Sequence, residues 1–144
     1  MSRLVVDASV ALKWYFRTRT DEPDVELALQ VLQGVHDGRF NLLQPPHFLT
    51  EMAAVLIREA PGTAATNWHD LQLIEMQIVE NPAVYARAMA LSKRHKHHLF
   101  DTLYHAVALE AGDAVLVTAD AHYARKARGD GGIVLLSFFE GLSD

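Results

Sequence analysis

Short runs of apolar residues, uninterrupted by polar positions, recur along the chain at Leu4–Val6, Ala114–Val117 and Ile133–Leu136. Runs of this length that are rich in β-branched residues are typical of buried strands. We therefore predict strands at 3–6, 114–117 and 133–136, and a further short strand at 40–43. Because these runs are continuous rather than alternating, they favour a parallel sheet with helices on both faces.

The segments between the strands have helical spacing of their apolar residues, with proline at several starts and glycine at several ends. The predicted helices are 9–16, 23–38, 48–60, 63–79, 82–93, 99–111 and 121–128. In 63–79 the last residues fit either a helix or an extended segment. Strands alternating with helices, without repeats or a linker, predict one α/β domain over residues 1–144.

The composition limits the chemistry that this chain can perform. It has 144 residues, no cysteine and a formal net charge of −5. Disulfides, thiol catalysis and cysteine-built zinc sites are excluded, which fits a cytoplasmic protein. No apolar stretch is long enough for a transmembrane helix, so we expect no membrane association. The negative charge argues against nucleic-acid binding by bulk charge, but not against an enzyme that meets phosphate through metal ions.

Acidic residues stand at positions where an α/β fold gathers functional groups. Asp7 and Asp120 each follow a predicted strand and precede a helix, Asp101 lies in the first turn of a helix, and Glu51 lies in mid-helix near Arg58. Ligands of open parallel sheets bind beyond the carboxyl ends of the strands. The aspartates could equally be helix caps, and Glu51 could pair with Arg58. Pattern alone leaves both interpretations open.

Four segments in order, "VVDASVALKW", "LTEMAAVL", "FDTLYHAVAL" and "VLVTAD", resemble PIN-domain ribonucleases, and most of all the VapC-type toxins of VapBC toxin–antitoxin pairs. The resemblance covers nearly the whole chain and implies a PIN-like three-layer fold with a central parallel sheet flanked by helices. It implies a metal site with catalytic acids and metal ligands at Asp7, Glu51, Asp101 and Asp120. The hydroxyls of Ser9 and Thr118 would orient carboxylates or water. Many family members have Asn three residues after the helical Glu, where this chain has Ala54.

The resemblance also implies an activity and partners. We expect RNA hydrolysis with one or two Mg²⁺ or Mn²⁺ ions, a toxin role, neutralisation by a VapB-type antitoxin and a homodimer. The antitoxin would reach over the acidic site with a basic side chain. Two alternatives remain: a PIN nuclease of RNA maturation outside toxin–antitoxin systems, and a non-catalytic α/β binding module whose acids are helix caps.

Two further segments have two interpretations each. The basic run "KRHKHH" at 93–98 precedes Asp101, and Arg125, Lys126 and Arg128 follow Asp120. The run at 93–98 either contacts RNA phosphates or forms a solvated surface, and a histidine metal site there lacks paired ligand spacing. Arg125, Lys126 and Arg128 either contact phosphates or favour the carboxyl end of their helix by their charge. The consecutive aromatic residues 14–16 cannot all face one core, so at least one should point outward, either under the following loop or toward a protein partner.

Overall fold

A five-stranded parallel sheet forms the centre of the molecule in this computed structural model, which describes residues 2–139. Its strands lie in the order β3-β2-β1-β4-β5, and every neighbouring pair is parallel. Their bounds are β1 Ser2–Val6, β2 Phe40–Gln44, β3 Gln77–Ile78, β4 Ala114–Thr118 and β5 Ile133–Leu135. The prediction of a parallel α/β sheet is confirmed.

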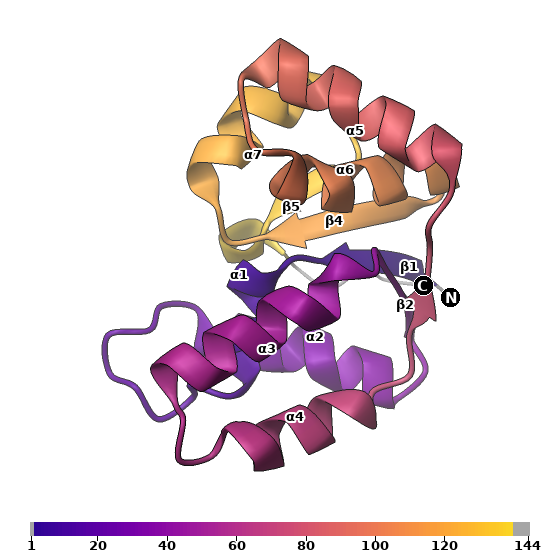
Figure 1. Cartoon of the computed structure of the whole chain (residues 1–144). Coiled ribbons are helices and arrows are strands. Elements are labelled where there is room, and N and C mark those ends of the chain that lie inside the picture. Colours follow the sequence, from indigo (N-terminus) through magenta and orange to yellow (C-terminus); the bar gives the residue numbers. More distant parts are fainter. Residues whose placement is uncertain (1, 140–144) are drawn as a thin grey trace.

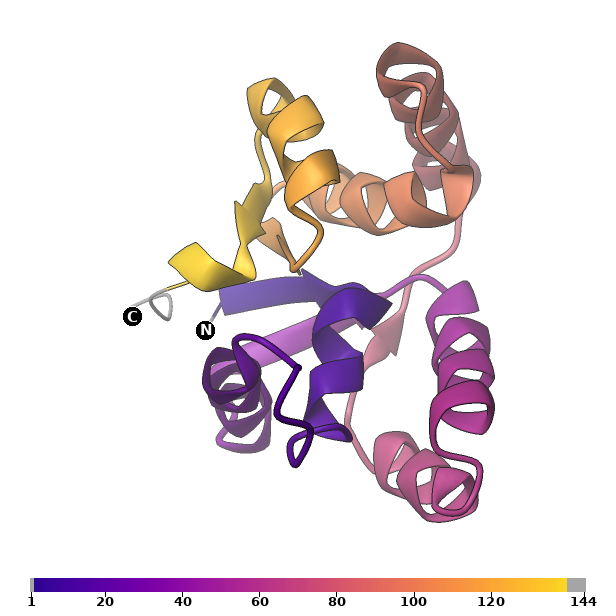
Figure 2. The same cartoon turned by 90° about the vertical axis from the view of Figure 1, so that its left-hand side faces the viewer.

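Helices cover both faces of this sheet. The α-helices are α1 Ala8–Ala11, α2 Val25–His36, α3 His47–Glu59, α4 Ala64–Gln72, α5 Pro82–His95, α6 Leu99–Ala111 and α7 Ala121–Ala127. Helices α5 and α6 lie on one side of the sheet and α2 on the other (Figures 1 and 2). Among the described residues no helix combines the length and apolarity needed to cross a bilayer.

Two of the three apolar runs form buried strands as their pattern predicts, whereas Ile133–Leu135 of the edge strand β5 is only partly buried. Leu4, Val5 and Val6 of β1 are fully buried, and α6 is buried from Thr102 to Ala108 because it packs against β1, β2 and β4. Each buried Leu or Val side chain contributes about 1.5–3 kcal/mol relative to exposure. Strand β1 is therefore covered on both faces, and this packing fixes the position of Asp7, the residue that follows it.

A buried amide extends the hold on β1. The backbone ladder between β1 and β2 reaches only Leu4 and Leu42. Beyond it the fully buried Gln44 side chain receives the Val6 N–H on Oε1 at 2.9 Å and donates from Nε2 to the Val6 carbonyl at 2.7 Å. The amide thus replaces a strand partner, and both backbone groups of Val6 are satisfied directly before Asp7.

The structure decides the open end of one predicted helix and corrects another. Segment 63–79 is helical only to Gln72, and its end is the extended strand β3 at the sheet edge. Segment 9–16 forms the single turn α1 followed by a 3-10 turn, Leu12–Trp14. Trp14 and Phe16 are buried, with the Trp14 indole N–H donating to the Ala28 carbonyl at 2.8 Å, and only Tyr15 is partly exposed.

Candidate metal centre

Four acidic side chains come from four different parts of the fold to the carboxyl edge of the sheet. Asp7 follows β1 and Asp120 follows β4, and these strands are direct neighbours with Val6 opposite Val117. Chain order reverses between them, because β2 lies on one side of β1 and β4 on the other. This is the position where open α/β sheets bind ligands. Glu51 reaches it from α3 and Asp101 from the first turn of α6.

Asp7 has a hydroxyl donor on each carboxylate oxygen. Ser9 Oγ donates to Oδ1, and Thr118 Oγ1 donates to Oδ2 at 2.5 Å. Asp7 occupies the N-cap position of α1 but makes no side-chain capping hydrogen bond. The capping alternative therefore does not account for this residue, whose carboxylate is held by the two hydroxyls.

The surroundings of Asp7 favour its protonated form. Burial raises its pKa from 3.8 to about 6, and the charge of Asp101 acts in the same direction. The hydrogen bonds from Ser9 and Thr118 lower the pKa by a smaller amount. Without a cation nearby, the carboxylate is thus poorly compensated, since both of its donors are neutral.

Glu51 is anchored by a buried tyrosine. The Tyr104 hydroxyl donates to Glu51 Oε1 at 2.5 Å, and the Tyr104 ring is almost fully buried. Burial raises the pKa of Tyr104, and the charges of Glu51, Asp7 and Asp101 raise it further. One side chain therefore lies close to three of the four acids. The alternative ion pair of Glu51 with Arg58 does not form, because Arg58 pairs with the neighbouring Glu59 at 3.3 Å.

Asp101 and Asp120 lie nearer the surface, with 44% and 36% of their side chains exposed. Asp120 Oδ1 accepts the Tyr123 N–H at 3.1 Å, so this residue is a true N-cap of α7. Its other oxygen, Oδ2, lies 3.9 Å from His97 Nε2, and Asp101 Oδ2 lies 2.9 Å from the same nitrogen. The predicted capping hydrogen bond does form for Asp120, but it uses only one of the two carboxylate oxygens.

Two residues of the centre were missed by the sequence analysis. Tyr104 stands one turn after Asp101 on the same helix, a spacing that could have indicated it. His97 stands four residues before Asp101 but outside the helix, so helical periodicity gave no reason to select it among its neighbouring histidines. Its imidazole lies between the two exposed carboxylates.

The donor set suits a hard divalent cation. Carboxylate oxygens predominate, and one donor atom from each of His97, Asp101 and Asp120 lies within 4.8 Å of the other two. Mg²⁺ and Mn²⁺ prefer such oxygen ligands. Like charges also converge here, as the effect of Asp101 on Asp7 indicates. Binding a cation would remove this repulsion, so the residues present fit the ion.

The basic run before Asp101 divides into two groups. Arg94 and His95 pair with Asp130, the histidine at 2.6 Å. A shallow open hollow beside the acids is lined by the other group together with residues of α7: Ser92, Lys96, His97, His98, Leu99, His122 and Lys126. Cationic side chains thus adjoin the acidic centre on one side, where they can meet an anionic ligand.

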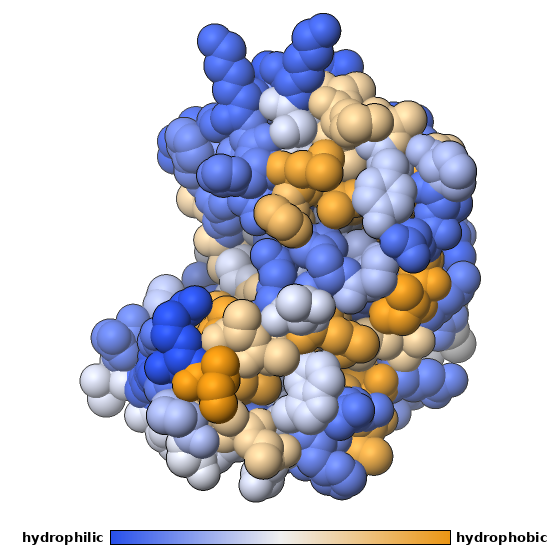
Figure 3. Space-filling view, in the orientation of Figure 1, coloured by the Kyte–Doolittle hydropathy of each residue, from blue (hydrophilic) through white to orange (hydrophobic). Residues whose placement is uncertain are grey.

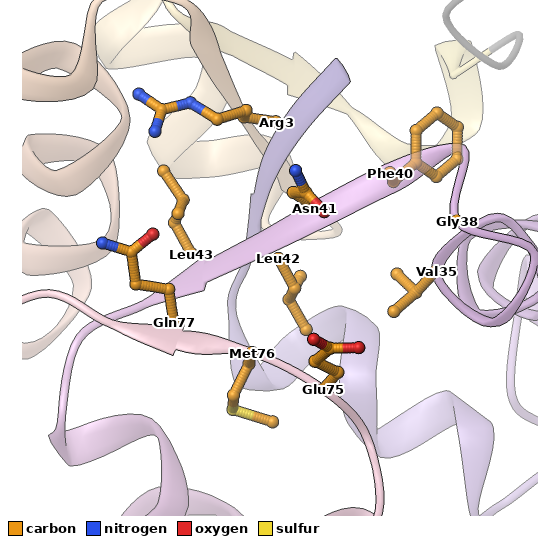
Figure 4. Close-up of a pocket in the computed structure, with 10 residues that line it drawn as sticks. All are labelled: Arg3, Val35, Gly38, Phe40, Asn41, Leu42, Leu43, Glu75, Met76 and Gln77. Carbon is orange, nitrogen blue, oxygen red and sulfur yellow. The ribbon is translucent and has the colours of Figure 1, made fainter. Parts of the chain in front are cut away.

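Surface shape does not by itself single out this centre. A space-filling view shows hydrophilic residues across the middle of one face, between more hydrophobic groups above and below (Figure 3). A separate hollow of about 330 Å³ lies where β2 meets the segment before β3, with Phe40, Leu42 and Met76 among its lining residues (Figure 4). None of the four acids lines it, so we assign the centre from its chemistry.

Comparison with known proteins agrees with this arrangement. The chain matches the family model described as PIN domain over residues 4–129. Similar solved structures include PAE2754 from Pyrobaculum aerophilum, with a TM-score of 0.64 and 18% identity over 94% of this chain and 90% of that one. They also include VapC20 of Mycobacterium tuberculosis, a sarcin-ricin loop cleaving toxin, with a TM-score of 0.61 and 17% identity over 85% and 93%. No curated protein matches the chain by sequence. Residues 4–129 and the shared fold show that this chain belongs to the PIN domain family, a family of nucleases.

Proposed function

We propose that the protein is a metal-dependent endoribonuclease that acts as the toxin of a type II toxin–antitoxin pair. Asp7, Glu51, Asp101 and Asp120 would hold one or two Mg²⁺ or Mn²⁺ ions. The observation that carries this proposal is the convergence of these four acids, from four elements, on the carboxyl edge of one sheet, where Tyr104 contacts Glu51 and His97 contacts Asp101. Helix capping does not require such convergence.

The described side chains have separable tasks in RNA hydrolysis. A bound ion would supply an activated water and stabilise charge on the leaving oxygen. Ser9 and Thr118 orient Asp7, and Tyr104 orients Glu51. Lys96 and Lys126, which line the neighbouring hollow, would hold RNA phosphates in register without reading sequence.

The biological part of the proposal rests on the likeness to VapC20, which is described as a toxin that cleaves the sarcin-ricin loop. By analogy we infer an RNA substrate, a VapB-type antitoxin whose basic side chain enters the acidic centre, a homodimer of one-domain chains (residues 1–144) and a cytoplasmic location. Asp101 and Asp120 are exposed enough to receive such a side chain.

Cleavage of a structured RNA pool by the purified protein tests the enzymatic part. We expect cleavage with Mg²⁺ or Mn²⁺, none with EDTA, and a loss of at least about a hundredfold in Asp101→Asn and Asp7→Asn. Asp113→Asn is the matched control, because Asp113 precedes β4 at the opposite edge and is paired with Arg3. Metal-dependent cleavage that survives in Asp7→Asn and Asp101→Asn would refute the assignment.

Induced expression tests the toxin role. Growth of a bacterial host should stop when the wild-type protein is induced, and should continue with Asp101→Asn at equal protein level. Co-expression of the neighbouring small gene, where one is present, should restore growth. A protein that cleaves RNA in vitro but leaves growth unaffected would instead support a nuclease of RNA maturation.

A further inference from the structure

His97 lies between the two exposed carboxylates of the centre. Its Nε2 is 2.9 Å from Asp101 Oδ2 and 3.9 Å from Asp120 Oδ2. We propose that His97 is a nitrogen ligand of the ion held by Asp101 and Asp120, and that it shifts the preference of the centre away from Mg²⁺ toward Mn²⁺. This inference rests on the metal centre of the proposed function and names a ligand that the acids alone do not include.

The spacing of the three donor atoms fits a shared ion. Around an octahedral ion with bonds near 2.1 Å, adjacent donors lie about 3.0 Å apart and opposite donors about 4.2 Å apart. The two measured separations from Nε2, 2.9 and 3.9 Å, fall within this range. The oxygens of Asp101 and Asp120 lie within 4.8 Å of each other, so small side-chain adjustments would bring all three donors to one ion.

The chain fixes the His97 ring in this position. Helix α5 ends at His95, and the capping residue Lys96 takes the left-handed conformation with φ of 51°, so that the next residue turns back toward the centre. The His97 N–H donates to the Ser92 carbonyl at 3.2 Å, and the Ser92 hydroxyl donates to the His97 carbonyl. The imidazole packs against the Tyr123 ring at 4.6 Å between centroids, and only 10% of the side chain is exposed. A ring held on this many sides is preorganised for a ligand.

The contact between Lys126 and the His97 ring opposes binding of an ion to Nε2. Its Nζ lies 3.3 Å from His97 Nδ1. Lysine only donates, so Nδ1 accepts here and Nε2 carries the proton that is shared with Asp101. An ion on Nε2 takes the place of this proton, and Nδ1 then carries a hydrogen that Lys126 cannot accept. The lysine thus opposes ligation, and Lys126→Gln, whose amide oxygen can accept that hydrogen, should favour it.

The consequence for metal choice follows from ligand chemistry. Mg²⁺ binds carboxylates and water, and it gains little from imidazole. Mn²⁺ accepts both oxygen and nitrogen ligands, so a histidine improves its binding relative to Mg²⁺. The ratio of the two affinities is therefore the quantity that His97 should control.

Calorimetric titration of the full chain with Mn²⁺ and with Mg²⁺ measures this ratio. We expect His97→Gln to raise the dissociation constant for Mn²⁺ about tenfold or more, and that for Mg²⁺ less than about threefold. The matched control is His122→Gln, since His122 is exposed and its ring lies 6.2 Å from the His97 ring. It should leave both constants unchanged.

Pulsed electron paramagnetic resonance of the Mn²⁺-loaded protein gives a second readout that needs no variant. A coordinated imidazole nitrogen should couple to the ion in the wild type and in His122→Gln, but not in His97→Gln. Mn²⁺ binding without this coupling, or an equal loss of both metals in His97→Gln, would overturn the inference and leave His97 as a residue that positions Asp101. Absence of metal binding in the wild type would overturn the proposed function together with it.

Discussion

The two halves of the acidic centre are built differently. The inner pair, Asp7 and Glu51, accepts hydrogen bonds from hydroxyls that are anchored in the fold, including the buried Tyr104. The outer pair, Asp101 and Asp120, is more exposed and contacts His97 and a backbone N–H. Neutral hydroxyls fix the direction of a carboxylate without neutralising it. The difference shows that the inner pair is oriented in advance, and in the proposed function the outer pair would control how an ion enters and which ion remains.

The largest expected effect is on metal affinity: loss of an acid of the outer pair should weaken binding more than loss of a hydroxyl that orients the inner pair. Asp101→Asn should weaken Mn²⁺ binding about a hundredfold or more, because it removes a charged donor. Ser9→Ala removes only one hydroxyl from Asp7 and should weaken binding by about tenfold. Calorimetric titration of both variants measures the contrast. Equal losses would show that the division into two pairs has no consequence for metal binding.

The next effect concerns stability without metal. Because the pKa of Asp7 is about 6 in the folded protein and 3.8 in the unfolded chain, the folded state binds this proton more tightly. The contribution of Asp7 to stability is therefore fully present below pH 3.8, and it is lost as pH rises to about 6. Asp7→Asn avoids this loss and should be about 1–2 kcal/mol more stable than the wild type at pH 7.5 in EDTA.

Urea unfolding of both proteins from pH 4 to pH 8 in EDTA measures this difference. The advantage of Asp7→Asn should shrink toward pH 4, where the wild-type carboxyl is protonated. Adding Mn²⁺ should stabilise the wild type more than the variant, since only the wild type has the full donor set. An advantage that is constant across the pH range would mean that Asp7 does not titrate as described.

A smaller effect tests the tyrosine that supports Glu51. Tyr104→Phe keeps the buried ring but removes the hydroxyl, so cleavage should fall about tenfold while the fold is retained. Tyr85→Phe is the matched control, because Tyr85 donates to the exposed Glu80 at 2.5 Å, away from the acids. If the two variants kept equal activity, orientation of Glu51 would not matter to catalysis.

The smallest effect concerns the basic hollow beside the outer pair. Lys96→Gln should weaken binding of single-stranded RNA a few fold and reduce the slope of log affinity against log salt by about 0.7. Arg39→Gln changes the same charge at the amino edge of the sheet, before β2, and should leave the slope unchanged. Filter binding in Ca²⁺ at four salt concentrations measures both slopes. Identical slopes would make the hollow a solvated surface only.

The sequence predicted the fold well wherever burial is continuous. Residues 4–6 and 114–117 are apolar because both faces of their strands are covered. Such a run can be recognised from a few neighbouring residues alone. Strand β3 lies in the end of segment 63–79, for which the pattern fits either a helix or an extended segment, because two exposed residues at a sheet edge carry no periodicity. Its position depends on β2, which no local pattern encodes.

The candidate site was predictable to a different extent. All four acids were proposed from the resemblance, and Asp7 and Asp120 also from their positions after strands, but the roles of their neighbours were not predicted. Tyr104 belongs to an apolar helix, where a tyrosine is expected to be an ordinary core residue. Its hydrogen bond joins it to Glu51, 53 residues away in the sequence. His97 enters the centre through the left-handed turn at Lys96, a backbone conformation that residue type alone does not indicate.

The hydrogen bond from Thr118 to Asp7 also affects when the acidic centre can form during synthesis of the chain. It joins residues 111 positions apart, and β1 gains its partner β4 only over a similar distance. At about 5–20 residues per second, a ribosome needs about 6–22 seconds between synthesising these two residues. During that interval a growing chain can pair β1 with β2 but has no complete acidic centre. The acidic centre can therefore assemble only after translation has passed Asp120.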